Sequence, residues 1–113
     1  MKKEELMIGD WVYNTHNRQN EQVAEIGSGL VMLDYNDLYE YDEIEPIPLT
    51  TEILERNFHE PNEGVVWWKN DEPFYHVECL PLNGMRLIMP YTLYVHELQH
   101  ALRLAGIDKE IKL

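Results

Sequence analysis

Short β-favouring segments, separated by turn residues, dominate the first part of the chain. The segments Ile8–Tyr13, Gln22–Ile26 and Leu30–Leu33 are rich in apolar, β-branched or aromatic residues. Gly27–Gly29 separates the second segment from the third and favours a hairpin, because glycine adopts positive φ angles without strain. Consecutive short strands favour antiparallel pairing. We therefore predict a small SH3-like antiparallel β-barrel, or a curled sheet, over residues 1–49.

The pattern is less regular between Leu33 and Thr50. Tyr35–Tyr41 is acidic and rich in tyrosine, which predicts a loop. In Asp42–Leu49, two prolines each lack a backbone N–H. This segment is therefore expected to form an edge strand or an extended exit from the sheet.

A short helix and a second hairpin are predicted next. Thr50 is suited to cap a helix that runs to Phe58, and Asn57 is suited to end it in the left-handed conformation. Two β-favouring runs, Val65–Lys69 and Phe74–Leu80, flank a turn and predict a hairpin.

Further along, the turn dipeptide at Asn83 precedes a short apolar run, Met85–Met89, which predicts one more strand. Within the hairpin, alternation places His76 and Glu78 on the same face. We expect His76 to be a half-exposed structural histidine.

The segment Tyr91–Gly106 has the strongest helical pattern in the chain. Its apolar residues recur at helical spacing, at Tyr91, Tyr94, Val95, Leu98, Ala101, Leu102 and Ala105. On such a helix His96 and His100 project away from the apolar stripe, so we expect both to face outward. The predicted fold class is α+β, in one domain over residues 1–113, with a β-rich half (1–49) and a half (50–113) containing the middle helix, the hairpin and the C-terminal amphipathic helix.

Length and cysteine content narrow the class of protein. A chain of 113 residues fits one domain with a hydrophobic core. No apolar run approaches the roughly 18 residues of a transmembrane helix, and the N-terminal residues lack the apolar core of a secretory signal. Cys79 is the only cysteine and lies in an apolar run, which indicates a buried thiol. We therefore expect a cytoplasmic protein without a membrane partner.

The formal net charge of −12 is the most unusual bulk property. It repels phosphate backbones, so direct nucleic-acid binding is disfavoured. The densest acidic stretch includes Asp34, Asp37, Glu40, Asp42 and Glu43. The simplest interpretation is a solvated face, and the second is a surface that binds a basic protein partner.

The letters HELQH provide the one catalytic-looking motif. In an HExxH metallopeptidase, His96 and His100 would bind zinc and Glu97 would act as the general base. A zinc enzyme also needs a third protein ligand, and the residues after His100 offer only two acids. We therefore interpret the motif as coincidental and predict neither an enzyme nor a cofactor, with a zinc metallopeptidase as the alternative.

Four segments, read in order, resemble a known family. IGDWVY (Ile8–Tyr13), VAEIGSG (Val23–Gly29), YDEIEPIPLTTEILERNF (Tyr41–Phe58) and YVHELQHALRLAG (Tyr94–Gly106) are similar to small uncharacterised proteins of gut anaerobes, their phages and mobile elements. Members carry the patterns GNxVY, EPIPLTEExLxxxGF and YVHxLQNLYFALTG. The resemblance covers most of the chain and is loosest over Val65–Met89.

The resemblance implies a docking helix rather than a metal site. The family pattern requires neither the glutamate at Glu97 nor the histidine at His100, where asparagine is typical. Its recurring residues are matched here by Tyr94, Val95, His96, Leu98 and Gln99. The resemblance transfers no catalytic residue.

We accordingly predict a non-enzymatic accessory protein of phage or mobile-element origin that acts by protein–protein contact. In one version, its acidic surface imitates a phosphate backbone and inhibits a host defence factor. A third interpretation is an oligomeric structural module assembled through Trp67, Trp68, Leu93 and Leu104. The sequence names no partner and leaves the oligomeric state open.

Overall fold

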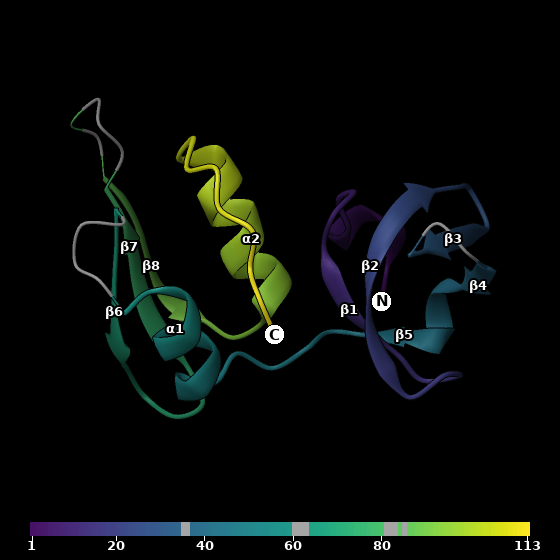
Figure 1. Cartoon of the computed structure of the whole chain (residues 1–113), viewed down its shortest axis with the longest axis horizontal. Helices are drawn as coiled ribbons and strands as arrows, with labels where there is room; N and C mark the ends of the chain where they lie inside the picture. Colours follow the sequence, from purple (N-terminus) through teal and green to yellow (C-terminus); the bar gives the residue numbers. More distant parts are fainter. Residues whose placement is uncertain (35–36, 60–63, 81–83, 85) are drawn as a thin grey trace. The chain divides into compact units, whose positions relative to one another are not determined.

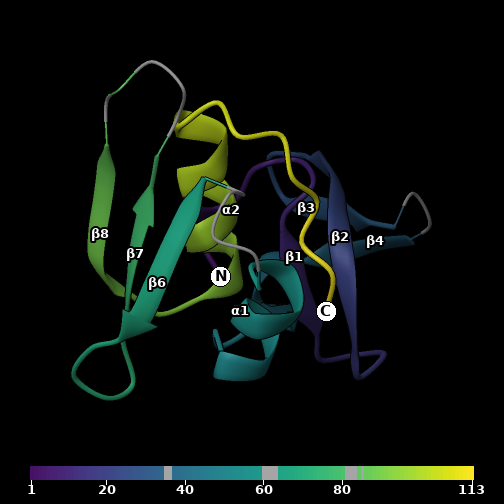
Figure 2. The same cartoon turned by 60° about the vertical axis from the view of Figure 1, so that its left-hand side comes forward.

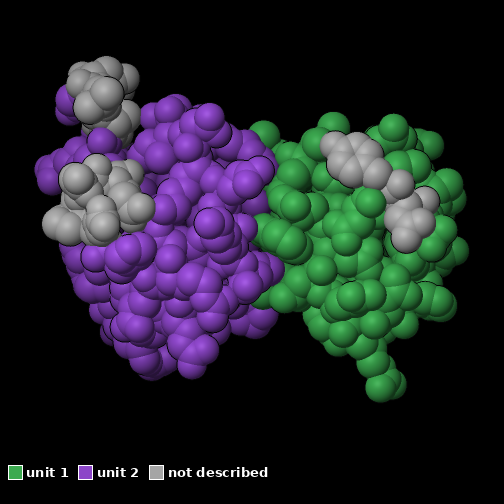
Figure 3. Space-filling view, in the orientation of Figure 1, with its two compact units in different colours: residues 1–47 green, residues 48–113 purple. Residues whose placement is uncertain are grey.

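The computed structural model describes residues 1–34, 37–59, 64–80, 84 and 86–113. The chain divides into two compact units, residues 1–47 and residues 48–113, which Figure 3 shows in different colours. The fold class is α+β, as predicted.

The first unit is a curled five-stranded antiparallel half-barrel, so the predicted curled sheet is confirmed (Figure 1). Its strands lie in the order β4-β3-β2-β1-β5. They are β1 (Trp11–Asn14), β2 (Gln19–Ile26), β3 (Leu30–Leu33), β4 (Asp37–Glu40) and β5 (Ile44–Glu45). Two single-turn 3₁₀ helices are η1 (Lys3–Glu5) and η2 (Tyr41–Glu43). Consecutive strands pair up to β4, and β5 returns to pair with β1.

Alternation along the strands builds the core of this unit. Val12 of β1, and Val31 and Leu33 of β3, have no measurable exposure. They pack in one cluster with Leu6, Val23, Tyr39 and Ile44. Because successive strand residues point to opposite faces, the residues between them lie on the outer face of the curled sheet.

The predicted loop at Tyr35–Tyr41 is wrong for its second half. Residues 37–40 form β4, which pairs with β3 along its whole length, and residues 35 and 36 lie outside the described residues. Tyr39 is the one buried side chain of this strand. A strand with a single buried side chain leaves little alternation in the sequence, so the acidic neighbours dominated the prediction.

The second unit packs two helices on a three-stranded antiparallel sheet. Its elements are α1 (Thr51–Asn57), β6 (Val65–Lys69), β7 (Tyr75–Cys79), β8 (Leu87–Thr92) and α2 (Val95–Leu104). The predicted hairpin is β6–β7, and β8 adds a third strand beside β7. Both helices lie on the same face of this sheet (Figures 1 and 2). Within the described residues, none of the helices combines the length and apolar character needed to cross a membrane.

The start of α1 follows the prediction and its end does not. The Thr50 hydroxyl oxygen accepts a hydrogen bond from the backbone N–H of Ile53 at 3.2 Å, which confirms the predicted cap. Asn57, expected to adopt the left-handed conformation, is instead the last helical residue and is 2% exposed. Its side chain binds backbone groups, as described below.

The last helix is shorter than predicted. Tyr91 and Thr92 belong to β8, and α2 begins at Val95. Pro90 did not end the strand, because β8 is an edge strand with a bulge in its pairing to β7, and both features tolerate a missing N–H. The predicted turn residue Asn83 and the predicted strand start at Met85 lie outside the described residues.

Candidate functional site

Glu97 of the HExxH motif caps the last helix. Its Oε1 accepts hydrogen bonds from the backbone N–H groups of Leu93, at 3.0 Å, and Tyr94, at 2.8 Å. A carboxylate at this position also interacts favourably with the positive end of the helix dipole. The structure therefore gives Glu97 a structural role as the cap of α2.

The two histidines do not both face outward as predicted. His96 is only 6% exposed, and His100 is partly buried. The His96 ring stacks on Tyr94 with centroids 5.7 Å apart, and it meets the His100 ring edge-on at 5.5 Å. The prediction was wrong because α2 buries His96 and Gln99 in addition to its apolar stripe.

Among the described residues, the motif has no third ligand of the kind that a zinc peptidase uses. Among the residues that the structure describes, no three His, Cys, Asp or Glu side chains come together as metal ligands would. A catalytic zinc site needs three protein ligands, and the mechanism needs a carboxylate available as base. Here the motif supplies two histidines, and Glu97 is bound to backbone N–H groups.

His76 and Glu78 share the outer face of the three-stranded sheet, as predicted. The His76 Nε2 lies 3.6 Å from Glu78 Oε1, and both side chains are 15% exposed. The His76 ring stacks on Trp68 with centroids 4.0 Å apart and planes within 10° of parallel. This packing makes His76 more buried than the half-exposed residue that we expected, with a structural role in holding the sheet face together.

The predicted acidic residues gather on neighbouring elements of the first unit. We call them the acidic surface: Asp34, Asp37, Glu40, Asp42 and Glu43. Asp34 follows β3, Asp37 and Glu40 belong to β4, and Asp42 and Glu43 belong to η2. Asp34 and Glu43 also bind backbone N–H groups, of Gln22 at 2.7 Å and Glu40 at 2.9 Å. Asp37, Glu40 and Asp42 are exposed to solvent.

The negative charge of the chain is concentrated in the same unit. Residues 1–47 contain eleven acidic and three basic residues, a formal charge of −8 out of the total of −12. Residues 48–113 carry the remaining −4 over a longer stretch. The field around the first unit is therefore strongly attractive to cations.

A polar network joins β4 to the β1–β2 loop. The amide nitrogen of Asn17 donates to the hydroxyl of Tyr39 at 2.9 Å and to the carboxylate of Glu21 at 3.1 Å. Glu21 is 5% exposed and also accepts a hydrogen bond from the Asn14 side chain at 3.0 Å. The network therefore links the β1–β2 loop to the strand that carries two of the exposed acids. Sequence reasoning missed it, since none of these residues belongs to a recognisable motif.

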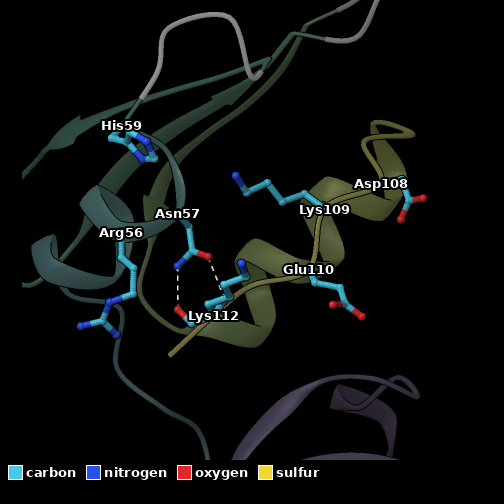
Figure 4. A pocket seen from close by; sticks show the side chains of 7 residues that line it. All are labelled: Arg56, Asn57, His59, Asp108, Lys109, Glu110 and Lys112. Carbon is cyan, nitrogen blue, oxygen red and sulfur yellow. Dashed lines mark hydrogen bonds between the residues drawn. The ribbon is translucent and has the colours of Figure 1, made fainter.

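The second unit contains a hollow of about 560 Å³ beside its C-terminal segment (Figure 4). The hollow is lined by Arg56, Asn57, His59, Asp108, Lys109, Glu110 and Lys112. The Asn57 side chain donates to the Lys112 carbonyl at 2.8 Å and accepts from the Lys112 N–H at 2.7 Å. The Lys109 ammonium lies 5.1 Å from the centre of the Phe58 ring, a cation–π contact. Because the lining mixes both charge signs, it selects no single class of ligand, and we assign the Asn57 contacts a structural role.

No protein-family model, curated protein sequence or solved structure matches this chain. The resemblance to the proteins of gut anaerobes and their mobile elements therefore stays a prediction. The functional interpretation depends on the geometry described above.

Proposed function

We propose that this protein acts by protein–protein contact, through binding of the acidic surface to a basic surface of a partner protein. The observation that carries the proposal is the charge of −8 on the 47 residues of the first unit, with exposed carboxylates at Asp37 and Glu40 of β4 and at Asp42 of η2. Charge complementarity of this kind accelerates association and makes it sensitive to salt. The protein is, in this proposal, a cytoplasmic, non-enzymatic accessory protein of phage or mobile-element origin, and a nucleic-acid channel of a host defence factor is one basic surface that it would fit.

A basic peptide tests the proposal directly. A fluorescent oligolysine is titrated with the protein, and with a variant that carries Asp37→Asn, Glu40→Gln, Asp42→Asn and Glu43→Gln. The matched control carries Glu55→Gln, Asp71→Asn, Asp108→Asn and Glu110→Gln in the second unit, so both variants have the same net charge. If each charge contributes about 0.5 kcal/mol, affinity falls by about thirty-fold in the first variant only. Equal losses in both variants would show that net charge alone drives binding and would refute the proposal.

A zinc metallopeptidase is the second candidate, favoured by the spacing of His96 and His100 on one continuous helix. Zinc held at about 100 times its dissociation constant stabilises a protein by about 2.7 kcal/mol. For this chain length that corresponds to a rise of about 10 °C in melting temperature. A melting temperature that is the same with zinc and with a chelator would eliminate this candidate.

An oligomeric module is the third candidate, favoured by two exposed side chains of the second unit. Trp68 is 49% exposed and Leu104 is 81% exposed. A double variant, Trp68→Ser with Leu104→Ser, would dissociate such an assembly. Light scattering that gives the monomer mass for the unchanged protein at all concentrations would exclude it.

A further inference from the structure

The outer face of β3 and β4 carries an apolar strip. Strand pairing sets Met32 opposite Leu38 and Leu30 opposite Glu40. Leu30 is 41% exposed and Leu38 is 56% exposed. Since their neighbours Val31, Leu33 and Tyr39 fill the core, alternation directs Leu30, Met32 and Leu38 to the other side of the sheet.

This strip borders a hollow of about 460 Å³ beside the β2–β3 turn. The lining of the hollow consists of Glu25, Ile26, Gly27, Ser28, Gly29, Leu30, Met32 and Leu38. Most of its lining is therefore apolar or glycine, and its one charged residue is an acid. A hollow of this kind accepts a bulky apolar side chain better than a polar one.

Tyr41 fixes the turn that forms one wall of the hollow. Its hydroxyl donates to the carbonyl oxygens of Gly27, at 2.5 Å, and Leu30, at 3.3 Å. Two effects raise the pKa of the Tyr41 hydroxyl above its usual value: the larger is partial burial, and the smaller is the negative charge of Glu4. The hydroxyl therefore keeps its proton at neutral pH and remains a hydrogen-bond donor to the turn.

Carboxylates stand on both sides of the strip. Glu25 lies opposite Met32 on β2, and Glu40 lies opposite Leu30 on β4. Both are exposed, and Asp37 precedes Leu38 on the same strand. The two outward apolar residues of β3 thus each face one acid, Met32 on the β2 side and Leu30 on the β4 side. The complement of the strip is a polypeptide segment with a bulky apolar side chain between basic ones.

We infer that the outer face of β3 and β4 binds a basic segment of a partner protein whose apolar side chain enters the hollow beside Leu30, Met32 and Leu38. The inference rests on the proposed function and narrows it. Lysine and arginine of the segment pair with Glu25, Glu40 and the acidic surface, which steers the encounter. Burial of the apolar side chain then decides which basic segments bind tightly, since charge complementarity contributes more to the association rate than to the affinity.

Two synthetic peptides separate the apolar contribution from the charge. Both are short, fluorescent and equally charged, one alternating lysine with leucine and the other alternating lysine with serine. We expect the leucine peptide to bind the full chain about ten-fold more tightly, the effect of burying part of one leucine side chain. Added salt weakens both peptides.

The variants Leu38→Ser and Leu30→Ser each reduce this preference to about two-fold, because the hollow loses an apolar wall. The control Leu104→Ser, an exposed leucine of the second unit, keeps the ten-fold preference. Circular dichroism confirms that each variant is folded, and two separate positions keep the test valid if one of them unfolds.

The possible outcomes distinguish a failure of this inference from a failure of the proposed binding to basic surfaces. If neither peptide binds at low salt, the proposed contact with basic surfaces is wrong. If both peptides bind the unchanged protein equally, the proposed function stands and the apolar hollow has no part in it. A leucine preference that survives in both strip variants would place the apolar contact elsewhere and overturn the inference.

Discussion

Replacement of Glu97 separates a structural role of the HExxH motif from a catalytic one. Glu97→Ala removes the oxygen, Oε1, that accepts hydrogen bonds from the backbone N–H groups of Leu93 and Tyr94, just before α2. A lost helix cap costs about 1 kcal/mol, and loss of the favourable charge at the helix N-terminus adds about 0.5 kcal/mol. We therefore expect a loss of about 1.5 kcal/mol, or about 6 °C in melting temperature.

Glu97→Gln gives a different result, because the amide oxygen of glutamine still accepts these hydrogen bonds. Only the interaction of the charge with the helix dipole is lost, so we expect a decrease of about 2 °C. If Glu97 were only a catalytic base, both variants would lose activity, and neither would need to have a lower melting temperature.

Thermal melting followed by circular dichroism is a suitable assay, because the two α-helices, α1 and α2, both belong to residues 48–113. Glu55→Ala is the matched control, since Glu55 is an exposed helical glutamate outside any capping position. If Glu97→Ala melts within a degree or so of Glu55→Ala, the capping explanation is refuted.

Three further predictions concern single residues. Asn57→Ala removes the hydrogen bonds to both backbone groups of Lys112 and should destabilise the second unit by about 2 kcal/mol. Hydrogen exchange at the Lys112 amide should become faster, and an unchanged exchange rate there would contradict this prediction. Gly27→Ala should lower the melting temperature of the first unit, because a Cβ at this position would lie 2.8 Å from the Leu30 carbonyl oxygen. Gly29→Ala is the control, because a Cβ there would meet nothing within 4 Å and should leave the melting temperature unchanged. Equal melting temperatures of the two variants would refute this prediction. Burial raises the pKa of the Cys79 thiol, so its contribution to stability is present below the ordinary thiol value of 9.0 and is lost as pH rises through the folded value. Denaturant titrations at increasing pH should therefore show a steeper fall in the free energy of unfolding for the unchanged protein than for Cys79→Ala. The same pH dependence in both proteins would contradict the raised pKa of Cys79.

Local signals predicted much of the fold. The Gly27–Gly29 hairpin and the Thr50 cap depend on residues that are close in sequence, so their chemistry is visible without a structure. The alternation in Tyr75–Cys79 likewise predicted that His76 and Glu78 share a face. In each case the determining interaction spans only a few residues.

Features that depend on distant residues could not be predicted in this way. The end of β8 is set by its pairing with β7 across the sheet, so Thr92 forms a strand although it belongs to a helical pattern. The burial of His96 depends on how much of the circumference of α2 is covered by the rest of the protein. The apolar stripe in the sequence does not specify that width.

The candidate site shows the same division. The acidic residues were predicted from their density along the chain, but the apolar strip beside them was not. A signal for the strip was present in Leu30–Leu33, four consecutive apolar residues. On a sheet with one buried face, such a run leaves two apolar side chains on the other face. Recognising it required knowing that the sheet is covered on one side only.

The course of β8 through Pro90 has a consequence for how copies of this protein would meet. An edge strand offers unpaired backbone groups to any extended chain that approaches, which is the usual route to strand-to-strand aggregation. In β8 a proline and a bulge interrupt that row, and the Pro90 carbonyl already accepts a hydrogen bond from the Asn70 side chain at 2.6 Å. The edge is therefore a poorer template for sheet extension than an uninterrupted strand of the same length.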